Sequence, residues 1–166
     1  MRSLLLALLV AGPALAQNPW DLAKKAVGGA AVGKVEKEVN QRLLAESRKN
    51  QCSFKSDSDV LVKGCDEKSR RLANALIDAK KKLAAAGVQN FKFEVSGHTD
   101  TSGKAEHNKE LSQKRAEVMK RELVKKGVDE KDIVTVGRGS ESPLVKPDDT
   151  PARKAQNRRY EIQVRL

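Results

Sequence analysis

Aromatic residues, cysteines and long apolar runs are all scarce in this chain of 166 residues. Aromatic residues make up only 3% of it, so a core would have to be built from aliphatic side chains. The one notable apolar run, residues 4–10, is too short to span a bilayer, which takes about 20 residues. We therefore expect no transmembrane segment in the mature chain.

The first sixteen residues have the features of a secretory signal. Arg2 gives a positive start, the apolar run comes next, and Ala14-Leu15-Ala16 is a small-x-small cleavage site. The mature chain would then begin at Gln17 and be exported from the cytoplasm. The alternative is an uncleaved anchor. The remaining length suggests one domain with an appendage.

Basic residues outnumber acidic ones, 33 to 22, which gives a formal net charge of +11. Removal of the signal removes one arginine and leaves 11 − 1 = +10. A basic protein attracts polyanions such as nucleic acid, lipopolysaccharide or the carboxylates of wall peptides. Export from the cytoplasm argues against nucleic acid, so we expect no nucleic-acid partner.

Cys52 and Cys65 are the only cysteines, and they enclose twelve residues. In an oxidising compartment such a pair usually forms a disulfide, and closing this loop would contribute about 3 kcal/mol to stability. The alternatives are two free thiols or a metal site. A metal site is disfavoured because there is no C-x-x-C spacing and neither histidine lies near in sequence. We expect no metal and no cofactor.

The segment 17–48 differs in composition from the rest of the chain, being rich in Ala, Val, Lys and Glu. Val32, Val35, Val39 and Leu43 fall at helical spacing, whereas nearby glycines weaken the first half of a helix. We expect a partly helical linker that packs either on the domain or on an envelope protein. The domain itself is expected to occupy residues 49–166.

Within that domain the pattern predicts alternating strands and helices. The predicted elements are a short strand through Cys52 and Phe54, a helix at 66–86, a strand at 91–96, a helix at 104–126, a strand at 133–136, a loop at 137–152 and a last strand at 159–166. Strands joined across helices should pair in parallel or skip a neighbour, with the helices on one face. The fold class is therefore α+β.

Four short motifs occur in a fixed order. They are S-G-H-T-D at 96–100, an asparagine at 108, L-S-Q-K-R-A at 111–116 and N-R-R at 157–159. In this order the chain, from about residue 50 to 166, resembles the OmpA-like peptidoglycan-binding domain. The resemblance implies a β-α-β-α-β-β two-layer sandwich with helices packed on a mixed sheet. It also implies a module without enzymatic activity that binds peptidoglycan.

The resemblance further implies which residues bind the ligand. Asp100 and Arg115 match the family's binding aspartate and arginine, and the ligand would be the zwitterionic end of diaminopimelate in a stem peptide. An aspartate can accept hydrogen bonds from the ammonium, and an arginine can hold the carboxylate with two parallel bonds. The further ligand-binding candidates are Asn108, Thr99, Thr101 and Arg158. We expect the side chains of Asp100 and Arg115 to converge on one cleft.

Each of these residues also has a purely structural interpretation. Asp100 could orient the loop before the helix, Arg115 could be solvated, and Asn157-Arg158-Arg159 could serve the fold. His98 is expected to pack and to form hydrogen bonds. Ser96, His98 and Asp100 do not make a hydrolase, because no G-x-S-x-G elbow exists and alternating residues of one strand do not form a triad.

Two functions remain in competition at this point. The first is a cell-envelope protein in the periplasm that binds the wall without covalent chemistry. The second is a subunit of an envelope or secretion assembly that uses the same fold for protein interaction through residues 17–48.

Overall fold

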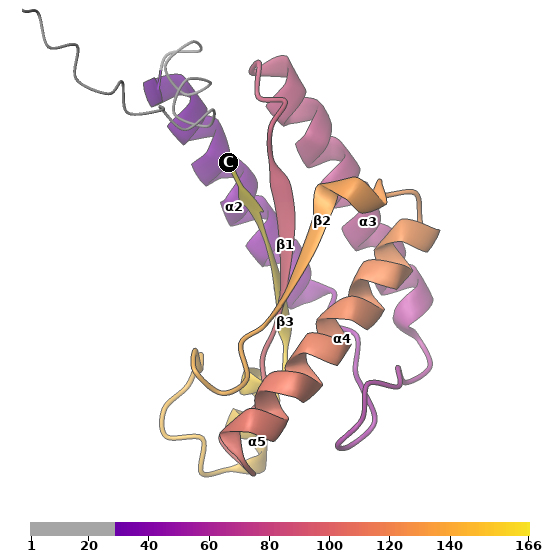
Figure 1. Cartoon of the computed structure of the whole chain (residues 1–166), viewed down its shortest axis with the longest axis vertical. Coiled ribbons are helices and arrows are strands. Elements are labelled where there is room, and N and C mark those ends of the chain that lie inside the picture. Colours follow the sequence, from indigo (N-terminus) through magenta and orange to yellow (C-terminus); the bar gives the residue numbers. More distant parts are fainter. Residues whose placement is uncertain (1–28) are drawn as a thin grey trace, which may run out of the picture.

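The computed structural model describes residues 29–166 and has the expected α+β class, with helices packed on a small mixed sheet (Figure 1). Its elements are α2 (Gly29–Lys49), α3 (Cys65–Ala85), β1 (Lys92–Gly97), α4 (Ala105–Lys125), the short 3-10 helix η1 (Glu130–Asp132), β2 (Ile133–Gly137), α5 (Pro151–Asn157) and β3 (Tyr160–Arg165). The signal segment expected at residues 1–16 lies outside the described residues.

The sheet has three strands in the order β2-β1-β3. β1 pairs with β2 in parallel and with β3 in antiparallel orientation. Because side chains alternate along a strand, Phe93 and Val95 share one face with Val164 and Ile162, and all four are fully buried. This face is the floor of the core.

Helices α3 and α4 pack against each other, and α4 covers β1 and β2. Their buried stripes follow helical spacing, as at Leu72, Leu76 and Leu83 of α3. Gly87 and Gly127 come after the two helices at positive φ, 76° and 95°, which is the left-handed conformation that ends a helix most easily on glycine. The sequence prediction for both helices is confirmed to within one residue at each end.

Helix α2 belongs to the same packed unit. Val32, Val39 and Leu43 are buried, and the helix contacts β3 and α3. Of the two alternatives for the segment 17–48, packing on the domain is what α2 does. The boundary expected at residue 49 therefore does not correspond to a break in packing, because the helix before it contributes to the core.

The free edge of β3 is covered by two side-chain amides. The Asn40 amide accepts from Val164 N at 2.6 Å and donates to Val164 O at 3.3 Å. The Gln51 amide accepts from Tyr160 N at 3.1 Å and donates to Tyr160 O at 2.7 Å. Each amide thus replaces one residue of a neighbouring strand.

The prediction of a sheet strand through Cys52 and Phe54 is wrong. Phe54 forms only an isolated antiparallel bridge with Leu61, so residues 53–62 make a small separate hairpin, here called the finger loop. The edge to which such a strand would add is the one that Asn40 and Gln51 already occupy. The β-α-β-α-β-β order expected from the sequence accordingly lacks its first strand in the described residues.

Cys52 and Cys65 form a disulfide, with Cα atoms 5.1 Å apart. The bond joins the base of the finger loop to the first residue of α3. Tyr160 accepts a hydrogen bond from Cys52 N at 3.1 Å and donates one to Asn50 O at 2.5 Å. The finger loop is therefore tied at its base to both α3 and β3.

The loop predicted at 137–152 ends in a helix that the sequence reasoning missed. α5 begins at Pro151, and Thr150 caps it by accepting a hydrogen bond from Arg153 N at 3.3 Å. Threonine followed by proline is a typical helix start, so the signal was present. This helix carries the first residue of the N-R-R motif, Asn157, at its end.

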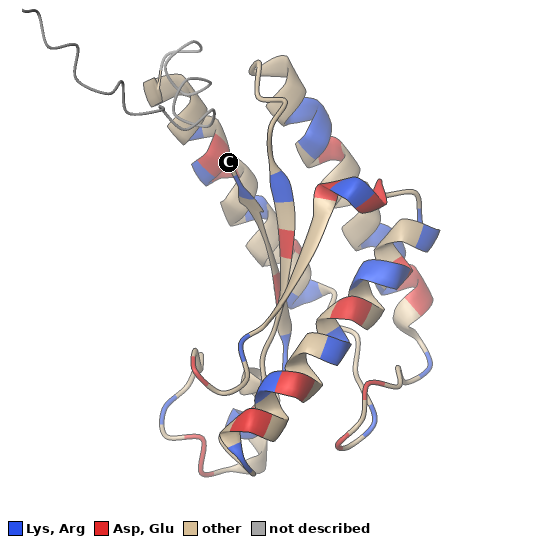
Figure 2. Cartoon of the chain, viewed as in Figure 1, with Lys and Arg blue, Asp and Glu red and all other residues tan. Residues whose placement is uncertain are grey.

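Basic and acidic residues are interspersed along α3 and α4, as Figure 2 shows. Several of them form ion pairs one helical turn apart, such as Arg70 with Asp66 at 2.8 Å. Such exposed pairs contribute little to stability individually. Among residues 29–166 no helix has the length and apolar character needed to cross a membrane.

Candidate functional site

A cleft of about 810 Å³ lies where β1 ends and β3 begins. Five parts of the chain line it. They are the end of α2 with the start of the finger loop, the segment after β1, the first half of α4, the loop before α5, and the end of α5 with the start of β3. Asp100, Asn108, Arg115, Thr99 and Arg158 all lie in its wall. The structure thus brings five of the six predicted ligand-binding residues to one cavity.

Asp100 is buried and forms an ion pair with Arg158, with 2.7 Å between Oδ2 and Nη1. Its other oxygen accepts a hydrogen bond from Ser102 N at 2.9 Å. Burial pushes the pKa of Asp100 upward, but the hydrogen bonds from Arg158 and Ser102 outweigh burial and hold the pKa below its ordinary value. Asp100 is therefore a carboxylate at neutral pH.

Arg115 is held by the finger loop. Its Nε donates to Ser58 O at 3.0 Å, its Nη2 donates to Lys55 O at 3.4 Å, and its guanidinium carbon lies 5.2 Å from the centre of the Phe54 ring. Burial and the neighbouring charge of Arg158 lower the pKa of Arg115. A guanidinium remains charged at any physiological pH, so Arg115 is a buried cation without a carboxylate partner among the described residues.

Asp100 and Arg115 thus lie in the same cleft, but neither is the other's partner. Asp100 pairs with Arg158, and Arg115 binds main-chain carbonyls. A ligand that bound both the Asp100 carboxylate and the Arg115 guanidinium would have to replace Arg158 and the main-chain carbonyls, or bind beside them.

Asn108 and the two threonines differ in how much they have left to offer a ligand. The Asn108 amide donates to Ser102 O at 2.8 Å and so holds the segment after β1 on α4. Thr101 donates through both its N–H and its hydroxyl to Asp148. Thr99 has a buried hydroxyl with no hydrogen-bond partner among the described residues. Thr101 lies outside the cleft wall, whereas Thr99 lines the cleft with its hydroxyl oxygen itself buried.

Asn157 organises the loops around the cleft. Its side chain is fully buried; its oxygen accepts from Leu144 N and Val145 N at 2.8 and 3.1 Å, and its nitrogen donates to Val145 O and Asp148 Oδ2, each at 3.0 Å. Hydrogen bonds from the Thr101 side chain, the Thr101 backbone and Asn157 lower the pKa of Asp148 to about 2. Thr101, Asp148 and Asn157, here called the clip, thus join the residue after Asp100 to the loop before α5 and to the end of that helix.

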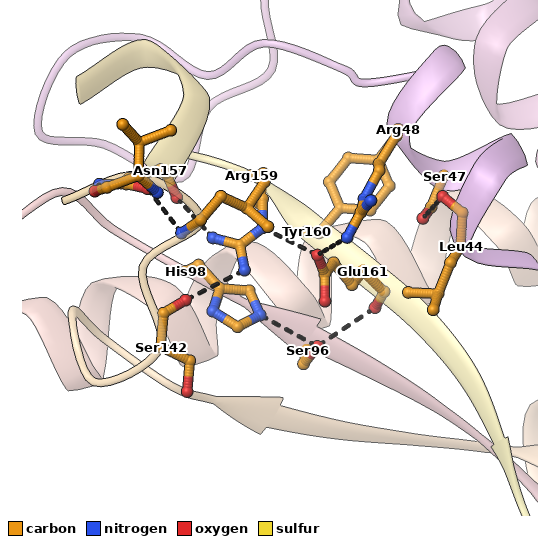
Figure 3. A network of polar contacts seen from close by, with 12 residues as sticks. Leu44, Ser47, Arg48, Ser96, His98, Ser142, Asn157, Arg159, Tyr160 and Glu161 are labelled. Carbon is orange, nitrogen blue, oxygen red and sulfur yellow. Dashed lines mark hydrogen bonds and ion pairs between the residues drawn. The ribbon is translucent and has the colours of Figure 1, made fainter. Parts of the chain in front are cut away.

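The two arginines of the N-R-R motif have different partners. Arg158 pairs with Asp100, whereas Arg159 donates to Glu161, to Asn157 O and to Ser142 O at 3.0, 3.3 and 3.0 Å (Figure 3). In this motif Asn157 binds the surrounding loops, Arg158 binds Asp100, and Arg159 binds the loop at Ser142. Only Arg158 among them extends a charged group toward Asp100.

His98 is buried beneath this network, with Nε2 3.3 Å from Ser96 Oγ (Figure 3). Its Nδ1 has no partner among the described residues, so no carboxylate orients it as a catalytic base would require. Burial and the positive charge of Arg159 lower the pKa of His98 to about 4.

The low pKa of His98 predicts a pH-dependent stability. Between about pH 6.5, the unfolded value, and the folded value the unfolded chain binds a proton that the folded chain does not. Stability should therefore fall as the pH drops through this window, by about 2 kcal/mol between pH 7 and pH 5. Urea unfolding at the two pH values tests this, with His98→Gln as the control that should lack this part of the pH dependence. Equal pH dependence of both proteins would contradict the assignment.

Sequence reasoning missed several residues of the site, among them Arg48, Gln51 and Asp148. Arg48 and Gln51 line the cleft from the end of α2, and Asp148 belongs to the clip. No motif marks them, because each reaches the site only through tertiary packing. Residues 29–166 contain no group of three or more histidine, cysteine or acidic side chains arranged to hold a metal ion.

The profile of the OmpA family matches residues 54–158. The chain is 46% identical over 71 residues to outer membrane porin F of Pseudomonas fluorescens, a match that covers 43% of this chain and 22% of that protein. It is 44% identical over 55 residues to the peptidoglycan-associated lipoprotein of Buchnera aphidicola, covering 33% and 32%. The chain thus spans about a fifth to a third of the length of these relatives.

Solved structures share the architecture. The peptidoglycan-associated lipoprotein of Burkholderia pseudomallei superposes with a TM-score of 0.57 at 27% identity, covering 69% of this chain and 89% of that one. The periplasmic domain of Helicobacter pylori MotB superposes with a TM-score of 0.57 at 22% identity, covering 68% and 69%, which shows the fold alone. Since the family profile covers well over half of the sequence, the chain belongs to the OmpA family.

Proposed function

We propose that this protein binds peptidoglycan without covalent chemistry, by holding the zwitterionic end of a diaminopimelate-type stem peptide. The observation that carries the proposal is the cleft in which an ionised Asp100 and a buried, charged Arg115 lie in one wall. The ligand's ammonium would bind the Asp100 carboxylate, and its carboxylate would bind the Arg115 guanidinium.

A ligand could displace the groups that Asp100 and Arg115 bind in the free protein. Arg158 is bound to only one oxygen of Asp100, and Arg115 is bound to two neutral carbonyls. A ligand carboxylate offers a guanidinium a stronger, charge-assisted bond than a carbonyl does.

The relatives support the same proposal. Several carry peptidoglycan in their names, among them the lipoprotein of Buchnera aphidicola and the peptidoglycan-binding protein ArfA of Mycobacterium bovis, which is 41% identical over 70 residues. The family profile matches residues 54–158, which include most of the residues that line the cleft. Together with the signal-like start of the sequence, these relatives support a site of action in the periplasm, at the wall or the outer membrane.

A sedimentation assay with purified peptidoglycan tests the proposal. The wild type should pellet with the wall, and Asp100→Ala and Arg115→Ala should each lose about 2 kcal/mol of binding energy, roughly 30-fold in affinity, because one charge of a desolvated pair is left unpaired. Asp78→Ala and Lys114→Ala are matched controls, since both remove exposed charges on α3 and α4. They should pellet like the wild type.

The outcome also separates the competing functions. Equal pelleting of all five proteins would indicate nonspecific attraction of a basic protein and would overturn the proposed site. Absence of pelleting by the wild type would instead favour the role of an interaction subunit in an envelope assembly. Release of soluble muropeptides during the assay would show enzymatic cleavage, which we do not expect.

A further inference from the structure

Arg48 extends into the cleft from the last turn of α2, outside the residues that the family profile matches. Gln51, Arg159 and Tyr160 line the cleft beside it. The binding pair of the proposed function, Asp100 and Arg115, comes from other elements, the segment after β1 and helix α4. This chain therefore adds a cationic group to the cleft from a helix that the matched region does not contain.

The position of Arg48 is fixed by a shared carboxylate oxygen. Arg48 Nη2 and Arg159 Nε both lie at hydrogen-bond distance from Glu161 Oε1, at 3.3 and 3.0 Å (Figure 3). The hydrogen bonds from Arg159 and Arg48 offset the burial of Glu161 and keep its pKa below the ordinary value. Two cations around one carboxylate leave a net positive charge at this end of the cleft.

The two arginines that bind Glu161 differ in their exposure and in their number of partners. The Arg159 side chain is 6% exposed, and all three of its nitrogens have protein partners. The Arg48 side chain is 55% exposed, and only one of its nitrogens has a partner among residues 29–166. A guanidinium carries five N–H donors, so most of those of Arg48 remain free for a ligand.

The size and the charge of the cleft fit a ligand with more than one anionic group. Its volume of about 810 Å³ is that of a site for a whole small ligand rather than for one amino-acid end group. Arg158 is paired with Asp100, and Arg159 with Glu161. Arg115 and Arg48 are the two guanidinium groups of the cleft that remain incompletely neutralised in the described structure.

We infer that Arg48 binds a second carboxylate of the same stem peptide and so makes the protein prefer peptides in which that carboxylate is free over peptides in which it is amidated. The inference rests on the proposed function, because the diaminopimelate end must be held by Asp100 and Arg115 for the second group to reach Arg48. An amide offers no charge and only one acceptor oxygen, and a bidentate bond to Arg48 is then impossible.

Binding of two synthetic tripeptides, measured by calorimetry, tests the inference. Both are alanyl-γ-glutamyl-diaminopimelate, one with the glutamyl α-carboxylate free and one with it amidated. The wild type should bind the free form about 10-fold more tightly, the difference that one charge-assisted hydrogen bond makes. Arg48→Gln should bind both forms equally, with an affinity close to that of the wild type for the amidated peptide.

Arg42→Gln is the matched control. Arg42 lies on the same helix, is 60% exposed, and forms one 3.3 Å ion pair with Asp78, away from the cleft. It should keep the 10-fold preference. A wild type that binds both peptides equally, or an Arg48→Gln variant that keeps the preference, would overturn the inference while leaving the proposed function intact. If the wild type binds neither peptide, the proposed function and the inference both fail.

Discussion

Replacing Gly97 with alanine should destabilise the protein by at least about 3 kcal/mol and also weaken ligand binding. A Cβ atom at this position would overlap the main-chain oxygen of Ser112 and lie 2.9 Å from its carbonyl carbon. Both clashing atoms belong to the backbone of α4, which cannot rotate away as a side chain can. The helix and the strand would have to separate.

The same contact is repeated on the neighbouring strand. Gly137 is paired with Gly97, and a Cβ there would lie 2.5 Å from Lys109 O and 2.7 Å from Gln113 N. Two adjacent glycines thus let α4 rest directly on the ends of β1 and β2. Helix α4 carries Arg115. Because Gly97 and Gly137 let α4 lie close to the sheet, they also bring Arg115 closer to Asp100.

Urea unfolding measures the effect on stability, and Gly33→Ala is the control. Gly33 lies within α2, and a Cβ at that position meets nothing within 4 Å. Alanine there should raise stability by about 0.8 kcal/mol, because it favours the helix more than glycine does. If Gly97→Ala were as stable as the wild type, the close contact between α4 and the sheet would be wrong.

Asn157→Ala should cost about 3 kcal/mol of folding free energy and loosen the cleft. The substitution removes four hydrogen bonds: two accepted from the N–H groups of Leu144 and Val145, one donated to Val145 O and one donated to Asp148. A hydrogen bond of this kind contributes about 1 kcal/mol, so the loss of four accounts for an effect of this size. The loop before α5 loses its anchor, and Asp148, which binds Thr101, loses one of its partners.

Two measurements separate this effect from a general loss of stability. Urea unfolding gives the free energy, and amide hydrogen exchange should show lost protection at Leu144, Val145 and Thr101 but not in α3. Gln156→Ala, one residue away and exposed, should change neither quantity. Unchanged protection of the Val145 amide in Asn157→Ala would show that the side chain does not organise the loop.

The parts of the fold that could be predicted from the sequence are those that depend on local patterns. α3, α4 and the three strands follow from apolar periodicity and from the glycines that end the helices. The placement of Asp100 and Arg115 in one cleft agrees with their motifs. The elements and the two site residues could be predicted because each depends on a short stretch of sequence.

The parts that could not be predicted depend on tertiary contacts. Nothing near Arg115 in sequence indicates that its partners are the carbonyls of Lys55 and Ser58, about sixty residues earlier. The continuous helix α2 forms despite its glycines because Val39 and Leu43 are buried against the sheet, and packing outweighs helix propensity. The missing strand near Phe54 is explained by the amides on the edge of β3, which no local pattern reveals.

Those amides also bear on how copies of the protein can coexist at high density. A border strand with unsatisfied N–H and C=O groups is a template for pairing with the same strand of another molecule, and such pairing can continue into fibrils. Asn40 and Gln51 form hydrogen bonds with Val164 and Tyr160 at the two ends of β3. Neither residue belongs to a strand, so the sheet does not continue beyond them. Pairing of another molecule's strand along this edge of the sheet is therefore blocked at Tyr160 and at Val164.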